Sequence, residues 1–157
     1  NLGRELQMLQ THAGAVISLT KRLLPAMLEQ GAGRILNVGS AGSLVPCPQD
    51  AVYSATKAFV LSFSEALAAE LRGSGVTVTA MLPGATRTAF ASNTGTDGCG
   101  AMDARQVAII GYRALMKGRR RVIPGTRNRL MMAAVRIMPA IIKDWMRHTI
   151  WCKFARA

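Results

Sequence analysis

Apolar side chains recur every three or four residues near the start of the chain, which is the spacing of one face of a helix. The pattern predicts a helix over residues 4–29, ended by Gly31 and Gly33, with a kink or a fresh turn at Pro25. The positions that form the apolar face are Leu6, Leu9, Ala13, Val16, Ile17, Thr20, Leu23, Leu24 and Met27.

Strand-like and helix-like patterns then alternate along the chain. Short apolar or β-branched runs predict strands over 34–38, 76–82 and 121–124, and helical spacing predicts helices over 51–71 and 103–117. This alternation is typical of a parallel sheet with crossover helices. We therefore expect an α/β fold: a partial Rossmann-type doubly wound parallel sheet, of which the chain holds the second half only, because no GxGxxG phosphate turn occurs in it.

The C-terminal part of the chain is strongly basic. The net charge is +12, and residues 113–157 contain twelve Lys and Arg against one acid, whereas residues 1–112 contain eight against seven. Met-rich helical patterns on either side of Pro139 predict a C-terminal basic helical extension. We divide the chain into a half-domain over 1–126 and a basic amphipathic tail over 127–157.

The basic tail has two open interpretations. The tail either lies in a membrane interface or packs on the body or a partner subunit. Binding to nucleic acid is disfavoured because no recognised fold or aromatic platform accompanies the charge.

The three cysteines indicate where the protein resides. Cys47, Cys99 and Cys152 stand far apart with no His at ligand spacing, so we expect no metal site. Without a secretory signal they fit reduced thiols, which predicts a cytoplasmic protein, or one peripheral to the membrane.

Three side chains carry candidate chemistry. Tyr53 and Lys57 stand four residues apart at the start of the second predicted helix, so they share a face. Ser40 follows the first strand and opens a predicted loop over 40–50, at the edge of the sheet where ligands bind in open α/β folds. A Tyr and a Lys at this spacing meet by chance on many helix surfaces, but the serine and a strand ending in Pro83-Gly84 make the combination more specific.

These residues lie in segments that resemble the second half of a short-chain dehydrogenase/reductase, over about residues 5–125. A looser likeness, in Val122-Ile123-Pro124-Gly125, is to the DltE-type bacterial branch of that family. The segments that carry the family resemblance are Asn37-Val38-Gly39-Ser40-Ala41-Gly42, Ala51-Val52-Tyr53-Ser54-Ala55-Thr56-Lys57-Ala58 and Leu82-Pro83-Gly84-Ala85-Thr86-Arg87-Thr88.

The resemblance implies a role for each of these residues. Tyr53 would be the general acid for ketone reduction or the base for alcohol oxidation; a free phenol has a pKa of about 10, and the ammonium of Lys57 favours the phenolate. Lys57 would also hold the nicotinamide ribose, and Ser40 would bind the substrate oxygen together with Tyr53. The positions that would border the nicotinamide of NAD or NADP are Pro83, Gly84, Thr86 and Thr88, with Thr88 bonding the carboxamide.

One position departs from the family pattern. The family has an Asn in the helix before the serine strand, where it supports a water in the proton relay to the lysine, and His12 stands at that place. A neutral imidazole can also hold a water and titrates near pH 6.5. The alternative is that His12 marks a position that has drifted in a chain no longer under catalytic demand.

The sequence thus predicts an NAD(P)-dependent oxidoreductase that interconverts a carbonyl and an alcohol on a small-molecule substrate, as a fragment of a longer enzyme. The alternative is a non-catalytic remnant that acts as a dimerising interaction module. In the family, helices matching residues 4–29 and 51–72 often form a dimer interface, so we also expect a homo-oligomer.

Overall fold

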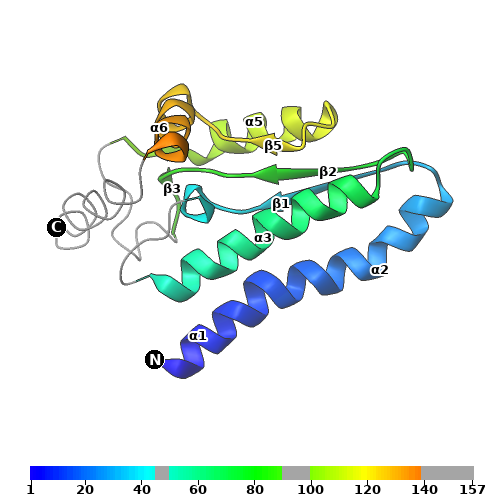
Figure 1. The fold of residues 1–157 in the computed structure, drawn as a ribbon, viewed down its shortest axis with the longest axis horizontal. Coiled ribbons are helices and arrows are strands. Elements are labelled where there is room, and N and C mark those ends of the chain that lie inside the picture. The colour runs from blue at the N-terminus through cyan, green and yellow to red at the C-terminus, as the bar shows by residue number, and fades with distance from the viewer. Residues whose placement is uncertain (45–49, 90–99, 139–157) are drawn as a thin grey trace.

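The structure is a computed structural model that describes residues 1–44, 50–89 and 100–138. Helices and strands alternate along it as the sequence predicts (Figure 1). In chain order the elements are α1 (Leu2–Leu9), a π-helical turn η1 (Gln10–Gly14), α2 (Ala15–Glu29), β1 (Gly33–Val38), a 3-10 turn η2 (Ala41–Ser43), α3 (Ala51–Glu70), β2 (Val76–Met81), β3 (Thr86–Arg87), β4 (Met102–Asp103), α5 (Ala104–Met116), β5 (Arg121–Val122) and α6 (Thr126–Ile137).

The main sheet is parallel, with the strand order β1-β2-β5. Strand β1 pairs with β2 from Gly33 opposite Val76 to Val38 opposite Met81, and β5 pairs with the end of β2. Helices α2 and α3 lie on one side of the sheet and α5 on the other (Figure 1). The expected α/β fold with a partial doubly wound sheet is confirmed. Among the described residues, no strand pairs with the outer edge of β1.

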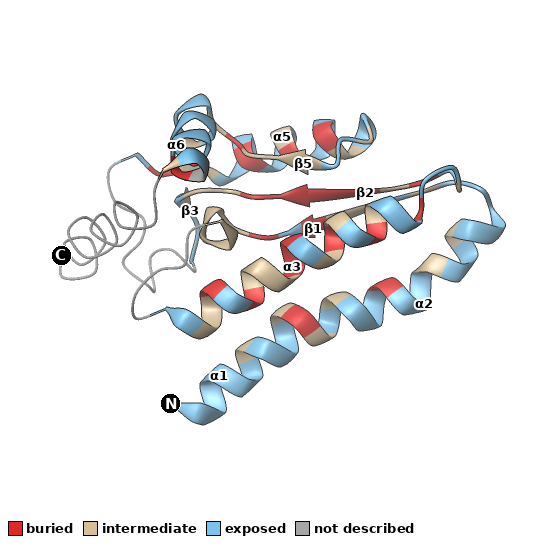
Figure 2. Ribbon diagram, in the orientation of Figure 1, coloured by how far each residue is buried: buried red, intermediate tan, exposed pale blue. Residues whose placement is uncertain are grey.

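The core forms where α3 packs on β2. Leu67 of α3 and Leu71, which caps the end of that helix, pack against Val76 and Val78, because alternate β2 side chains face the helix. Figure 2 shows the buried positions of α3 along its sheet-facing side. This apolar contact fixes α3 against the strand and thereby places the start of α3 near the end of β1.

A buried polar contact also joins β1 to α3. The amide Nδ2 of Asn37 donates to Ser64 Oγ over 2.9 Å, and that hydroxyl donates to the carbonyl of Val60 over 2.6 Å. Buried polar groups are costly without partners, so this chain of bonds favours a single position of the strand on the helix.

Three local features differ from the sequence-based expectation. The helix predicted over 4–29 contains the π turn η1, and α2 continues through Pro25 to Glu29. A 3-10 turn, η2, lies within the predicted loop over 40–50 because Ser40 and Ser43 cap each other. The short parallel ladder of β3 and β4 was not predicted, since two-residue strands leave no periodic pattern.

The beginning of the predicted basic tail packs on the body as α6. Met132 and Val135 are buried against Ala41, Leu44 and Ile123. The predicted helical piece beyond Pro139 and the three cysteines lie outside the described residues, and the division of the chain at 126/127 stays a prediction. Within the described ranges, no helix combines the length and the apolar composition needed to cross a membrane.

Candidate active site

The carboxyl end of β1 positions Ser40. The Gly39 N–H donates to the carbonyl of Met81 over 2.8 Å, which extends the β1–β2 pairing by one residue. Ser40 then begins η2: its Oγ accepts from the Gly42 N–H over 3.1 Å, and its own N–H donates to Ser43 Oγ over 3.2 Å. Ser43 Oγ in turn donates to the carbonyl of Lys57 over 2.8 Å. The serine turn is therefore fastened to α3.

Ser40 and Tyr53 both lie close to Gly42. A methyl group added to the α-carbon of Gly42 would lie 3.4 Å from Ser40 Oγ and 3.9 Å from Tyr53 Cε1. Both residues are half-buried. The structure therefore brings the hydroxyl of the strand-end serine and the ring of the tyrosine into the same neighbourhood, next to Gly42.

Lys57 lies one helical turn after Tyr53 on the same face of α3. Its Nζ is 5.8 Å from the centre of the Tyr53 ring and donates to the carbonyl of Val38 over 3.3 Å. Burial lowers the pKa of Lys57 from its ordinary value, because the ammonium loses hydration there. The contact with Val38 holds the ammonium at the end of β1, beside the tyrosine.

The segment after β2 lies against the serine turn. The Ala41 N–H donates to the carbonyl of Pro83 over 2.8 Å, so the Pro-Gly segment and Ser40 share one edge of the sheet. The Thr86 hydroxyl donates to the carbonyl of Gly84 over 3.0 Å, and the hydroxyl of exposed Thr88 donates to the carbonyl of Thr86 over 3.5 Å. The four residues predicted to border the nicotinamide therefore lie at the same edge of the sheet as the predicted catalytic residues. They are Pro83, Gly84, Thr86 and Thr88.

His12 is also brought to this site, although it lies in η1, which is far from α3 in the sequence and contacts it in the fold. Its Nδ1 is 3.0 Å from Thr56 Oγ1, and its ring meets the Tyr53 ring edge-on, with 5.9 Å between the ring centres and 76° between the planes. Burial, and then the positive charge of Lys57, lower the pKa of His12 from 6.5. Sequence reasoning missed Thr56, because nothing in the spacing shows which α3 residue faces position 12.

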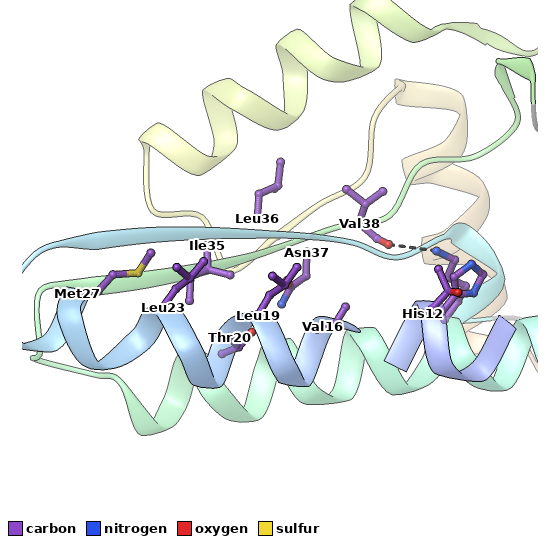
Figure 3. Close-up of a pocket in the computed structure, with 12 residues that line it drawn as sticks. His12, Val16, Leu19, Thr20, Leu23, Met27, Ile35, Leu36, Asn37 and Val38 are labelled. Atoms are coloured by element: carbon purple, nitrogen blue, oxygen red, sulfur yellow. Dashed lines mark hydrogen bonds between the residues drawn. The ribbon is translucent and has the colours of Figure 1, made fainter. Parts of the chain in front are cut away.

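A pocket of about 380 Å³ runs along the outer edge of β1, between this strand and α2. Figure 3 shows His12 and Met27 at opposite ends of it. The end at His12 also contains Lys57, while the remainder is mainly apolar. The described ranges hold no cluster of three or more His, Cys, Asp or Glu residues that could bind a metal ion.

Comparison with known proteins identifies the family of this chain. The family model described as short chain dehydrogenase matches residues 5–98. The chain belongs to this family.

Curated relatives of this chain of the short-chain dehydrogenase family match about half of its length. Very-long-chain 3-oxoacyl-CoA reductase of Bos taurus is 42% identical over 77 residues, which are 49% of this chain and 25% of the relative. Sulfoacetaldehyde reductase 2 of Chromohalobacter salexigens is 40% identical over 84 residues, 53% of this chain and 33% of the relative. The matched segment therefore spans about a quarter to a third of these relatives.

Solved structures of the family share the fold. A short chain dehydrogenase from Burkholderia cenocepacia in complex with NADP has a TM-score of 0.80 at 22% identity, covering 96% of this chain and 62% of that one. A short-chain dehydrogenase from Sphingobium yanoikuyae in complex with NADPH has a TM-score of 0.68 at 26% identity, covering 82% and 55%. This member of the short-chain dehydrogenase family thus covers little more than half of the length of these two solved proteins.

The residues at the sheet edge fit one end of a dinucleotide. An ammonium, a phenol and two threonine hydroxyls lie at this edge, and groups of these kinds can bond the hydroxyls of a ribose and the amide of a nicotinamide. They do not include the glycine-rich turn that binds a pyrophosphate. The hydrogen-bonding groups that this chain holds at the sheet edge therefore fit the nicotinamide end of the cofactor and not its pyrophosphate.

Proposed function

We propose that the protein is a nicotinamide-dependent oxidoreductase that interconverts a carbonyl and an alcohol through Ser40, Tyr53 and Lys57. The observation that carries this proposal is that Ser40 Oγ and the Tyr53 ring both lie next to Gly42, with the Lys57 ammonium beside the ring. Such an arrangement can hold one carbonyl oxygen between two hydroxyls next to a fixed positive charge.

Each side chain has a separate task in this proposal. The bound cofactor supplies or accepts the hydride at the carbonyl carbon. In the reductive direction the phenol of Tyr53 gives its proton to the carbonyl oxygen and becomes a phenolate, which the nearby Lys57 ammonium stabilises. Ser40 donates a hydrogen bond to the same oxygen and orients it. In the oxidative direction the phenolate takes the proton back.

The cofactor of the proposal is NAD or NADP, held at its nicotinamide end by residues of this chain. Lys57 and Tyr53 would bond the ribose hydroxyls, and Thr88 the carboxamide, while Pro83, Gly84 and Thr86 border the ring. We infer that the adenosine and pyrophosphate are held by further residues of a longer enzyme, which would pair with the outer edge of β1. The unpaired edge of β1 among the described strands supports this inference.

Cofactor binding tests the proposal. We expect no saturable NADPH fluorescence change for the 157-residue chain alone. A saturable change is expected once the chain is fused to the part of the solved Burkholderia relative that this chain does not cover. Lys57→Met in the fusion should weaken binding about 10- to 100-fold, the cost of losing hydrogen bonds from a charged donor.

The outcomes of this experiment separate the two functions that the sequence leaves open. A folded fusion that never binds NADPH would contradict the proposed oxidoreductase. A stable dimer that also lacks binding would instead support the non-catalytic interaction module, for which the exposed leucines Leu2, Leu6 and Leu9 of α1 offer an apolar surface.

We also propose, as a second and independent candidate, that α6 attaches the protein to an anionic membrane surface. Its exposed face carries Leu130 and Ile137, which are 74% and 85% exposed and lie seven residues apart on one side of the helix. Arg127 and Arg129 flank this face, and the charge of residues 113–157 is strongly positive. Apolar residues flanked by cations suit the boundary between lipid headgroups and acyl chains.

Sedimentation with vesicles tests this candidate. We expect the chain to pellet with vesicles containing phosphatidylserine and not with phosphatidylcholine alone. The double substitution Leu130→Glu and Ile137→Glu should weaken binding at least about tenfold, because two apolar side chains no longer enter the lipid. Ile109→Glu, which replaces an exposed apolar residue of α5, is the matched control and should bind like the parent. Equal pelleting of the parent and the double variant would overturn this candidate.

A further inference from the structure

The side chain of Asn128, in the first turn of α6, lies against Gly84 of the Pro-Gly segment. A methyl group added to the α-carbon of Gly84 would come within 2.7 Å of Asn128 Nδ2 and within 2.9 Å of both Cγ and Oδ1. A methyl carbon cannot approach other atoms that closely without displacing them. The amide of Asn128 therefore fills the place that a side chain at position 84 would need.

Two donated bonds hold this amide in place. Asn128 Nδ2 donates to the carbonyl of Pro124 over 2.9 Å and to Met102 Sδ over 3.7 Å. Pro124, which lies just after β5, is fully buried. Both hydrogens of the amide nitrogen thus have an acceptor, so the side chain has little freedom to turn away from Gly84.

The contact with Met102 leads back to the same segment. Met102 belongs to β4, where its N–H donates to the carbonyl of Ala85 over 2.9 Å and the residue pairs with Thr86 of β3. Asn128 therefore contacts residue 84 directly and reaches residues 85 and 86 through Met102. These positions belong to the segment 83–88, which the proposed function places beside the nicotinamide.

The rest of α6 gives Asn128 a firm base. Met132 and Val135 of this helix are buried against Ala41 and Leu44 of the serine turn. Figure 1 shows α6 at the end of the sheet where β3 also lies. One helix thus contacts both the turn that begins at Ser40 and the segment that follows β2, so it can fix the position of one relative to the other.

We propose that Asn128 is a positioning residue for the nicotinamide ring: its amide seats Gly84 and thereby fixes the segment 83–88 where the ring binds. The inference rests on the proposed function, in which this segment borders the ring. Asn128 does not itself touch the cofactor. Without its amide the segment gains room to move, and it must then be ordered when NADPH binds, which weakens the affinity for NADPH.

A double-mutant cycle in urea tests the seat itself, on the 157-residue chain without cofactor. Gly84 is not among the glycines with a positive φ, so the cost of Gly84→Ala comes from the clash with the amide. We expect Gly84→Ala to lower the urea midpoint clearly in the parent and much less in the Asn128→Ala background, where the space is free. Equal shifts in both backgrounds would overturn the inference.

Two ligands of the fusion distinguish positioning of the ring from a general structural role. One is NADPH and the other is 2′-phospho-ADP-ribose, which is NADP without its nicotinamide base. Asn128→Ala should weaken NADPH binding about tenfold and leave the affinity for 2′-phospho-ADP-ribose unchanged, as measured by calorimetry. The control is Leu130→Ala, which truncates a 74% exposed side chain of α6 and should leave both affinities at the parent level.

The outcomes separate this inference from the function on which it rests. Asn128→Ala with the same loss for both ligands, or with no loss for either, would overturn the inference alone. If Asn128→Ala does not fold, Gly84→Ala in the fusion decides the question, because it displaces the segment from the other side and should weaken NADPH binding selectively. A parent fusion that does not bind NADPH contradicts the proposed function, and this inference with it.

Discussion

Replacing Tyr53 with Phe is expected to lower carbonyl reduction by the NADPH-binding fusion about 10²- to 10⁴-fold, the usual contribution of a positioned general acid. The substitution removes one oxygen and keeps the aromatic ring, so the packing against His12 and the 5.8 Å approach of Lys57 to the ring centre should persist. The loss should therefore appear in kcat, with NADPH affinity changed much less. Consumption of NADPH with a panel of aldehydes and ketones measures it.

The second tyrosine of the chain provides the matched control. Tyr112 lies on α5 and is 61% exposed, on the opposite side of the sheet from the candidate site. Tyr112→Phe makes the same chemical change and should leave turnover at the parent level. Equal rates for the parent and Tyr53→Phe would remove the phenol from the mechanism.

Gly75→Ala is expected to cost about 3 kcal/mol or more of the free energy of unfolding, which is a large share of what a domain of this size has. Gly75 has a φ of +79°, and a methyl group there would clash with the carbonyl of Gly31 in the turn before β1. Strained backbone alone costs about 1–3 kcal/mol, and separating the two turns would disturb the start of the β1–β2 pairing. Urea denaturation measures the change.

A substitution at Gly73 separates the two causes of the stability that Gly75→Ala is expected to lose. It has a φ of +84°, but no atom lies within 4 Å of the place where its methyl group would be. Gly73→Ala should therefore cost only the backbone term, about 1–2 kcal/mol. If both variants lose the same stability, the close approach of the two turns has no energetic role.

Much of the fold follows from the sequence because it depends on local patterns. The strand over 34–38 and the helix over 51–71 appear as β1 and α3 with ends shifted by a residue at most, because strong periodicity and terminal glycines specify them. Ser40 and the α3 pair Tyr53 and Lys57 come together because the carboxyl edge of a parallel sheet and the start of the following helix adjoin by construction.

Other features depend on contacts that no local pattern records. The bond between His12 and Thr56 joins residues 44 positions apart, and it required the packing of the first helix against α3. The apolar pattern of α1 predicts a buried face, yet none of its residues is buried, because the contact of α1 with α3 leaves Leu2, Leu6 and Leu9 exposed. A periodic pattern identifies the face of a helix that seeks an apolar partner, but not which part of the protein supplies that partner.

A crystal structure of the fusion with NADP bound would show where the nicotinamide lies relative to the three proposed catalytic residues. We expect Lys57 Nζ within hydrogen-bonding distance, about 3 Å, of the nicotinamide ribose hydroxyls. We also expect the hydroxyls of Ser40 and Tyr53 to point to one position beside the nicotinamide ring. A nicotinamide bound elsewhere, or two hydroxyls directed to different sides of the sheet, would contradict the proposed function.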